Sequence, residues 1–96
     1  MVTADEIPDP SRLTLVTRLN GAEMQRATTD QLIFKIPKLF SYISTFTPLV
    51  PGDVIATGTP GGVGFKRNPP VFMKPGDTIE VEISGIGTLR NTIVEE

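Results

Sequence analysis

Turn-forming residues recur so closely along this sequence that long helices have little room to form. Nine prolines and nine glycines interrupt 96 residues. Proline lacks a backbone donor and glycine tolerates positive φ, so both residues end regular elements and favour tight turns. Short apolar segments between such turns are typical of antiparallel strands. We therefore expect a mostly β fold with one short helix.

A β-hairpin centred on Asn20-Gly21 is the most specific local prediction. This pair favours a type I′ turn, in which both central residues need positive φ. The first strand spans residues 13–19, and the second returns over residues 22–27. Its side chains are expected to alternate between two faces: Ala22, Met24 and Arg26 on one, Glu23 and Gln25 on the other. Gln25 is interpreted as part of the solvent-facing side.

The remaining elements follow from spacing. Apolar residues at steps of three and four predict a helix over residues 37–46, with its apolar face packed on a sheet. Alternation predicts strands at 54–57, 78–84 and 88–94, and turns at Pro51-Gly52-Asp53 and Pro75-Gly76-Asp77. The six aromatic rings are assigned to the core: Phe34, Phe40, Tyr42, Phe46, Phe65 and Phe72. Residues 1–12 are expected to form an extended arm.

Composition excludes several kinds of chemistry for this chain alone. It contains no histidine and no cysteine, so it can form neither a Ser-His-Asp triad nor a thiolate site. Its net charge of -2 argues against a nucleic-acid partner. No apolar run approaches the roughly 20 residues that span a bilayer, so no membrane partner is expected. The absence of cysteine and of a signal-like start leads us to expect a cytoplasmic protein.

The loop over residues 57–64 is the best candidate for a binding site. Its glycines allow backbone amides to approach a ligand, and the hydroxyls of Thr57 and Thr59 can donate to a carboxylate or an enolate oxygen. The loop matches neither a dinucleotide fingerprint nor a P-loop. A plain connection between strands remains the alternative interpretation.

Charged residues elsewhere carry weaker signals. Lys66 and Arg67 are interpreted as a solvated loop tip, with steering of an anionic substrate as the alternative. Glu80 and Glu82 share one strand face and are expected to face solvent. Asp5, Glu6 and Asp9 lie in a terminal arm, where a metal site is not expected.

Several motifs together resemble the C-terminal part of the fumarylacetoacetate hydrolase family. In chain order they are Thr3-Ala4-Asp5-Glu6-Ile7-Pro8-Asp9-Pro10; Leu19-Asn20-Gly21 with Gln25; Leu49-Val50-Pro51-Gly52-Asp53-Val54-Ile55-Ala56-Thr57-Gly58-Thr59-Pro60-Gly61-Gly62-Val63-Gly64; Lys74-Pro75-Gly76-Asp77; and Gly85-Ile86-Gly87-Thr88-Leu89-Arg90-Asn91. The Pro-Gly-Asp run joined to Thr-Gly-Thr-Pro is the specific element.

The resemblance implies a mixed β-sandwich roll and an enzyme that hydrolyses, decarboxylates or isomerises 2-oxo acids of the acylpyruvate type, as in aromatic catabolism. It implies that Thr59 contacts the substrate carboxylate, and that Gly58 and Thr57 shape the same wall. Family members use Mg²⁺ or Mn²⁺. The family's metal-binding carboxylates, active-site lysine and acid-base pair match no residue here, so no catalytic residue and no metal ligand is assigned to this chain.

The resemblance therefore implies a C-terminal piece, with residues 13–96 as a truncated catalytic domain that neither turns over substrate nor fully ligates a metal alone. Two alternatives stay open. One is a non-catalytic β module that forms a homodimer through faces left exposed. The other is a domain that binds small carboxylates through its glycine-rich loop.

Overall fold

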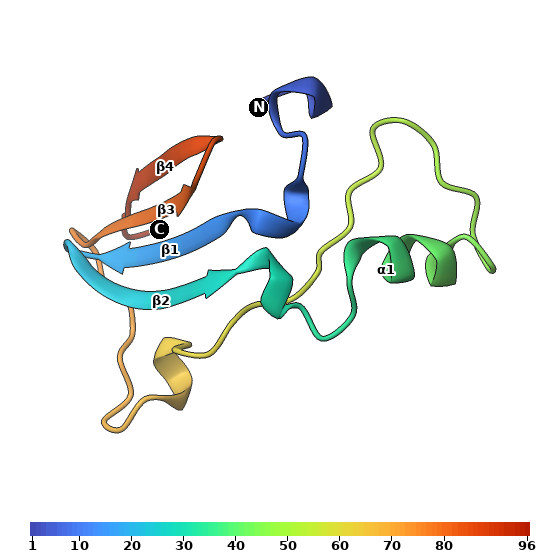
Figure 1. Ribbon diagram of the computed structural model, residues 1–96. Helices are drawn as coiled ribbons and strands as arrows, with labels where there is room; N and C mark the ends of the chain where they lie inside the picture. The colour runs from blue at the N-terminus through green and yellow to red at the C-terminus, as the bar shows by residue number, and fades with distance from the viewer.

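A four-stranded antiparallel sheet organises the computed structural model, which describes residues 1–96. The strands are β1 (Thr14–Leu19), β2 (Ala22–Thr28), β3 (Thr78–Ile83) and β4 (Gly87–Thr92), in the spatial order β2-β1-β3-β4 (Figure 1). One α-helix, α1 (Ile36–Ile43), lies between β2 and β3 in the chain. Four single-turn 3-10 helices complete the structure: η1 (Ala4–Glu6), η2 (Pro10–Arg12), η3 (Thr29–Gln31) and η4 (Gly64–Lys66). The expected mostly β fold with one short helix is confirmed.

The β1–β2 hairpin forms where the sequence predicts it. Asn20 has φ of 51° and Gly21 has φ of 82°, as a type I′ turn requires. Asn20 also binds the start of β3, because its Oδ1 accepts the N–H of Thr78 at 2.9 Å and its own N–H donates to the Thr78 carbonyl at 2.8 Å. The hairpin turn is therefore joined to the strand that follows β1 in the sheet.

Both Pro-Gly-Asp segments form the predicted turn. Gly52 and Gly76 have φ of 98° and 90°, the region that favours glycine. In each turn the aspartate accepts a backbone N–H three residues earlier, 2.9 Å for Asp53 and 3.0 Å for Asp77. The surroundings differ, because Asp53 is exposed whereas Asp77 is only 5% exposed. The second turn is thus built into the end of the sheet.

A β-bulge changes the predicted alternation of β2. The register shifts between Thr17 and Arg18, which pair with Gln25 and Glu23. One extra residue of β2 therefore lies between these two pairing positions. Glu23 and Arg26 consequently share a face and form an ion pair at 3.0 Å, although simple alternation placed them on opposite faces. The expectation that Gln25 faces solvent was wrong for the same reason, because the bulge turns it toward the loop after α1.

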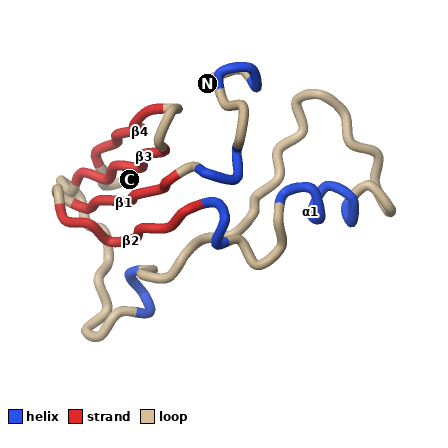
Figure 2. The backbone as a smooth tube through the Cα atoms, viewed as in Figure 1, coloured by secondary structure: helices blue, strands red, loops and turns tan.

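The predicted strand at residues 54–57 does not form. This segment belongs to a long irregular connection between α1 and β3, and no other strand lies beside it (Figure 2). A strand is stable only when a neighbour accepts and donates its backbone hydrogen bonds. Val54 remains 92% exposed, so an apolar sequence alone did not create a strand here.

Helix α1 forms close to its predicted position but does not pack as expected. It begins at Ile36, with Pro37 in the first turn where a missing N–H is harmless. None of its residues is buried, and Figure 1 shows it beyond the end of β2 rather than across the sheet. The prediction that its apolar face packs on the sheet was therefore wrong.

Very little of the chain is shielded from solvent. Val16 is the only buried apolar residue, at 4% exposure. The six aromatic side chains assigned to the core are all exposed: Phe34, Phe40, Tyr42, Phe46, Phe65 and Phe72. The radius of gyration is 15.7 Å, against about 12.5 Å for a compact chain of this length. Apolar side chains in this structure therefore lie on open surfaces rather than in a core.

Candidate functional site

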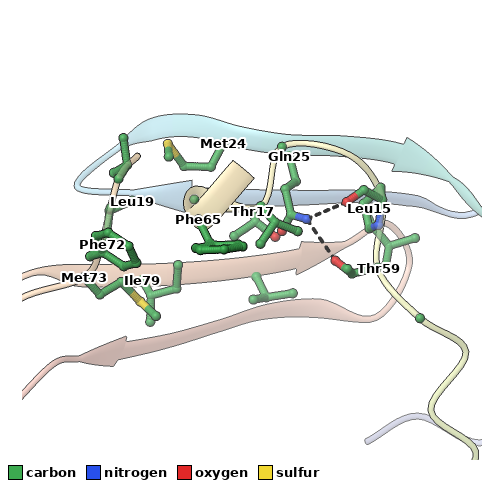
Figure 3. A pocket seen from close by; sticks show the side chains of 17 residues that line it. Leu15, Thr17, Leu19, Met24, Gln25, Thr59, Phe65, Phe72, Met73 and Ile79 are labelled. Carbon is green, nitrogen blue, oxygen red and sulfur yellow. Dashed lines mark hydrogen bonds between the residues drawn. The ribbon is translucent and has the colours of Figure 1, made fainter. Parts of the chain in front are cut away.

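The glycine-rich loop and one face of the sheet line an open cavity of about 610 Å³. Figure 3 shows two distinct ends: Leu19, Phe72 and Met73 gather at one, whereas Gln25 and Thr59 meet at the other. The sheet contributes Leu15, Thr17, Leu19, Met24, Gln25, Ile79 and Val81. The loops contribute Gly58, Thr59, Pro60, Gly62, Val63, Gly64, Phe65, Val71, Phe72 and Met73. The cavity therefore has an apolar floor and a small polar end.

The polar end depends on a side chain that reaches from β2 to the loop. Gln25 Nε2 donates to Thr59 Oγ1 at 2.9 Å and to the Pro60 carbonyl oxygen at 2.9 Å (Figure 3). A carbonyl oxygen only accepts, which fixes the orientation of the Gln25 amide with its nitrogen toward the loop. Gln25 therefore holds residues 59 and 60 against the sheet.

Arg67 anchors the far end of the same loop. Its Nε donates to the Gly62 carbonyl at 3.1 Å, and its guanidinium also donates to the Met24 carbonyl on the bulge. Arg67 is half-buried, so its interpretation as a solvated tip was wrong, because two backbone carbonyls hold it. Lys66 does remain exposed, with its ammonium 5.2 Å from the centre of the Phe65 ring.

Close approach of the loop to the bulge explains one of its glycines. Gly62 has φ of 100°, and a Cβ at this position would collide with the Met24 carbonyl oxygen. Gly61, its neighbour, has open space around the equivalent position. The loop therefore needs a glycine at 62 for both conformation and clearance.

The structure brings two of the three predicted binding residues into the lining of the cavity. Gly58, with φ of 101°, and Thr59 both line it, whereas Thr57 is exposed and lies outside the lining. The backbone N–H groups of residues 57–59 donate to no atom of the chain. The loop thus offers a hydroxyl and free amides beside the cavity.

Carboxylates are absent from the cavity lining, and no cluster of three acidic residues in the chain could hold a metal ion. Glu80 and Glu82 alternate with the cavity-lining residues of β3 and pair with arginines, Glu82 with Arg18 at 2.7 Å and Glu80 with Arg90 at 3.7 Å. Asp9 caps η2 by accepting the Ser11 N–H at 3.0 Å. These three carboxylates therefore bind other groups of the chain outside the cavity.

Four carboxyls outside the cavity have lowered pKa values, and Asp77 and Glu23 are the two on the sheet side of the molecule. The side-chain amide of Asn20, followed by the Lys74 N–H and ammonium, lowers the pKa of Asp77. The Arg26 guanidinium, through its hydrogen bonds and its charge, lowers the pKa of Glu23. Both carboxyls are therefore held in their charged form by direct partners.

Gln25 and Arg67 are the functional residues that sequence reasoning undervalued. The bulge that redirects Gln25 leaves no pattern in a strand of alternating polar and apolar residues. For Arg67, the available signal is the pair of glycines just before it, Gly62 and Gly64, which indicate that the loop approaches a strand closely. Backbone carbonyls at such an approach need hydrogen-bond donors, and a nearby arginine can supply them. Both side chains lie far in sequence from at least one partner.

The fold and the loop together define a domain of the fumarylacetoacetate hydrolase class. Residues 1–94 match the family described as fumarylacetoacetate (FAA) hydrolase C-terminal, and the chain belongs to this family. It is 46% identical over 94 residues to oxaloacetate tautomerase FAHD2A, mitochondrial, of Bos taurus, covering 98% of this chain and 30% of that protein.

Solved structures of the family share the fold seen here, which confirms its assignment to the C-terminal part of the family's β-sandwich roll. Fumarylacetoacetate hydrolase from Exiguobacterium antarcticum gives a TM-score of 0.93 at 40% identity, over 99% of this chain and 34% of that one. Maleylpyruvate hydrolase from Sphingobium sp. SYK-6, solved with manganese(II) and pyruvate, gives 0.85 at 37% identity, over 98% of this chain and 33% of that one. The chain thus spans about a third of the length of these relatives. No helix has the length and hydropathy to cross a membrane.

Proposed function

We propose that this chain supplies one wall of a pocket that binds 2-oxo acids of the acylpyruvate type, in an enzyme that hydrolyses, decarboxylates or isomerises them. One observation carries the proposal: Gly58 and Thr59, whose backbone N–H groups donate to no atom of the chain, line an apolar cavity together with the Thr59 hydroxyl, and no carboxylate lies in that lining. Donors without competing carboxylates favour an anionic ligand.

The two ends of the cavity match the two ends of such a substrate. Thr59 and Gly58 would bind the carboxylate, with Thr57 flanking them on the same loop. The apolar end, near Leu19 and Phe72, would receive the acyl portion and exclude water from it (Figure 3). Pyruvate in the solved maleylpyruvate hydrolase from Sphingobium sp. SYK-6 is a 2-oxo acid of the proposed class.

A metal ion does not fit the residues of this chain. The cavity lining contains no carboxylate, imidazole or thiolate, which are the ligands that such ions use. We propose that a Mg²⁺ or Mn²⁺ ion, as the Sphingobium relative holds manganese(II), would take its ligands from polypeptide other than these 96 residues. The role assigned to this chain is to bind and orient the carboxylate.

We further propose that residues 13–96 form the part of the domain that bears the pocket, with residues 1–12 as an arm at its edge. A cytoplasmic location stays a prediction that the lack of cysteine supports. Neither a nucleic acid nor a membrane is proposed as a partner.

Titration of the isotopically labelled chain with pyruvate, followed by NMR, tests the proposed site. The backbone amides of residues 57–59 should shift with millimolar pyruvate, and Thr59→Val should weaken this binding by about tenfold through loss of a charge-assisted hydrogen bond. Thr47→Val is the matched control, because Thr47 is exposed and its hydroxyl binds nothing in the chain. Equal binding by the wild type and Thr59→Val would exclude the assigned role.

A second candidate function rests on the exposed apolar surface. Only Val16 and Asp77 are buried, whereas large side chains such as Ile33 and Val54 are about nine-tenths exposed, at 91% and 92%. Soluble proteins rarely leave such surface open, so we propose that the chain associates with a second copy as a homodimer. Light scattering during size-exclusion chromatography tests this, and a monomer at all concentrations would contradict it.

A further inference from the structure

We propose that Gln25 is a positioning residue that commits the Thr59 hydroxyl to donating a hydrogen bond into the cavity. The inference rests on the proposed function, in which Thr59 binds a carboxylate. It adds a reason why that hydroxyl acts as a donor, and it assigns this role to a residue on another element of the fold, strand β2.

The direction of the Gln25–Thr59 hydrogen bond follows from a third group. The Pro60 carbonyl oxygen lies 2.9 Å from the same Gln25 nitrogen and can only accept. The amide nitrogen must therefore face the loop, and its second N–H donates to Thr59 Oγ1 at 2.9 Å. Reversing the amide would place two carbonyl oxygens against each other.

A threonine hydroxyl has one proton and two lone pairs. When Gln25 occupies a lone pair of Thr59 Oγ1, the single proton must point elsewhere. No atom of the chain accepts it. Thr59 lines the cavity, so the free direction is available to a ligand oxygen or to water. A carboxylate only accepts hydrogen bonds, and it therefore matches a hydroxyl with a committed proton.

Gln25 is well placed to impose this orientation because its own backbone is fixed on both sides. It pairs with Thr17 across the β1–β2 ladder, next to the bulge. The carbonyl of its neighbour Met24 accepts from the Arg67 guanidinium, which also holds the Gly62 carbonyl. The strand and the loop are thus locked together at two points, and the Gln25 side chain, half-buried between them, bridges the gap.

Gln25→Glu keeps the shape of the side chain but replaces its donors to Thr59 Oγ1 and the Pro60 carbonyl with acceptors. The introduced carboxylate can accept only, so it takes the Thr59 proton and withdraws it from the ligand. Its negative charge also repels a carboxylate ligand. Pyruvate binding, measured by NMR titration of the labelled chain at pH 7, should weaken by at least about tenfold.

Gln31→Glu is the matched control for added charge. Gln31 Oε1 accepts the Thr28 N–H at 2.9 Å, and a glutamate oxygen can do the same. This variant should bind pyruvate as the wild type does. The strand amide resonances of each variant report whether the sheet is retained.

A pH series tests whether the proton on the side chain at position 25 controls the loss of binding. As the pH falls toward the ordinary glutamate pKa of about 4.3, the introduced carboxyl gains a proton and becomes a donor again. Pyruvate is the stronger acid and stays ionised. The ratio of variant to wild-type dissociation constants should therefore fall toward one as the pH is lowered to about 4.5.

Each outcome is informative. If the wild-type chain gives no pyruvate-dependent shift at residues 57–59, the carboxylate site itself is excluded, and the positioning role with it. If the wild type binds and Thr59→Val weakens binding while Gln25→Glu does not, the positioning role alone is overturned. A loss in Gln25→Glu that persists unchanged at low pH would also overturn it, because the regained proton should restore a donor toward Thr59 Oγ1.

Discussion

The side-chain amide of Asn20 donates to Asp77 Oδ1 across 2.9 Å and joins two turns that lie 57 residues apart in the chain. Asn20 belongs to the β1–β2 hairpin turn, and Asp77 to the Pro-Gly-Asp turn before β3. Asn20 also accepts the Thr78 N–H at 2.9 Å. One side chain at the end of β1 thus satisfies a carboxylate and a backbone N–H at the start of β3.

We expect Asn20→Ala to destabilise the fold by about 1–2 kcal/mol, because two side-chain hydrogen bonds are lost and alanine tolerates positive φ poorly. Urea unfolding followed by circular dichroism measures the change. Asn91→Ala on β4 is the matched control, since the Asn91 side chain is exposed and binds no other group. Equal midpoints for both variants would contradict the role of Asn20.

Stability should fall in acid because of Asp77. Its pKa is lowered in the folded chain, chiefly by the Asn20 amide and then by the Lys74 N–H. A carboxyl with a lowered folded pKa stabilises the fold fully above its unfolded pKa of about 3.9 and loses that contribution as the pH falls through the folded value. Between about pH 5 and about pH 2.5, the free energy of unfolding should therefore fall more in the wild type than in Asp77→Asn.

Asp53→Asn provides the comparison for this acid effect. Asp53 makes the same local turn contact, but it is exposed and has no asparagine partner. Its replacement should leave most of the acid dependence in place. An acid dependence that is identical in Asp77→Asn and in the wild type would show that Asp77 is not its source.

Gly62→Ala should displace the loop from β2. The added Cβ would meet the Met24 carbonyl, and φ of 100° is strained for alanine. We expect pyruvate binding to be lost while the amides of β1, β3 and β4 keep their chemical shifts, because the collision involves only the loop and the bulge of β2. Gly61→Ala, with open space at its Cβ position, should bind normally. NMR titration of both variants with pyruvate tests this prediction. Normal binding by Gly62→Ala would show that close approach to Met24 does not require glycine at position 62.

Arg67→Lys should loosen the same loop without removing charge. Lysine cannot present the planar fork with which Arg67 reaches the Gly62 and Met24 carbonyls together. Amide hydrogen exchange at Lys66 and Val71, whose N–H groups donate to the loop carbonyls of Val63 and Gly64, should accelerate severalfold, whereas exchange in β1 and β3 should change little. Arg12→Lys, at an exposed ion pair with Asp9, serves as control. Unchanged loop exchange would mean that Arg67 is not an anchor.

Sequence reasoning succeeded where the conformation is decided within a few residues. Asn20-Gly21 and the two Pro-Gly-Asp segments specify their turns by permitted φ values, and all three form as predicted. It failed where distant segments decide the outcome. The bulge in β2 and the contacts of Arg67 depend on how the loop meets the strand, and the exposure of Phe40 depends on what lies beside α1.

The candidate site was half predictable for the same reason. Thr59 and Gly58 were identified by the chemistry of the loop, and the structure puts both in the cavity lining. The assignment of Gln25 to solvent failed because alternation carries no information about an inserted residue. The family resemblance, by contrast, was confirmed along residues 1–94.

Val16 alone has its apolar side chain sealed from water. Thermal unfolding of this chain by itself should therefore expose less apolar surface than unfolding of a compact domain of the same length. Its heat-capacity increment should fall below the roughly 1.2–1.4 kcal/mol/K expected for 96 residues with an ordinary interior. Any polypeptide that settles over the open faces would raise that increment and steepen the melting curve. Calorimetry of the chain with and without such a polypeptide would thus report how much of the cooperativity of unfolding depends on contacts outside the chain.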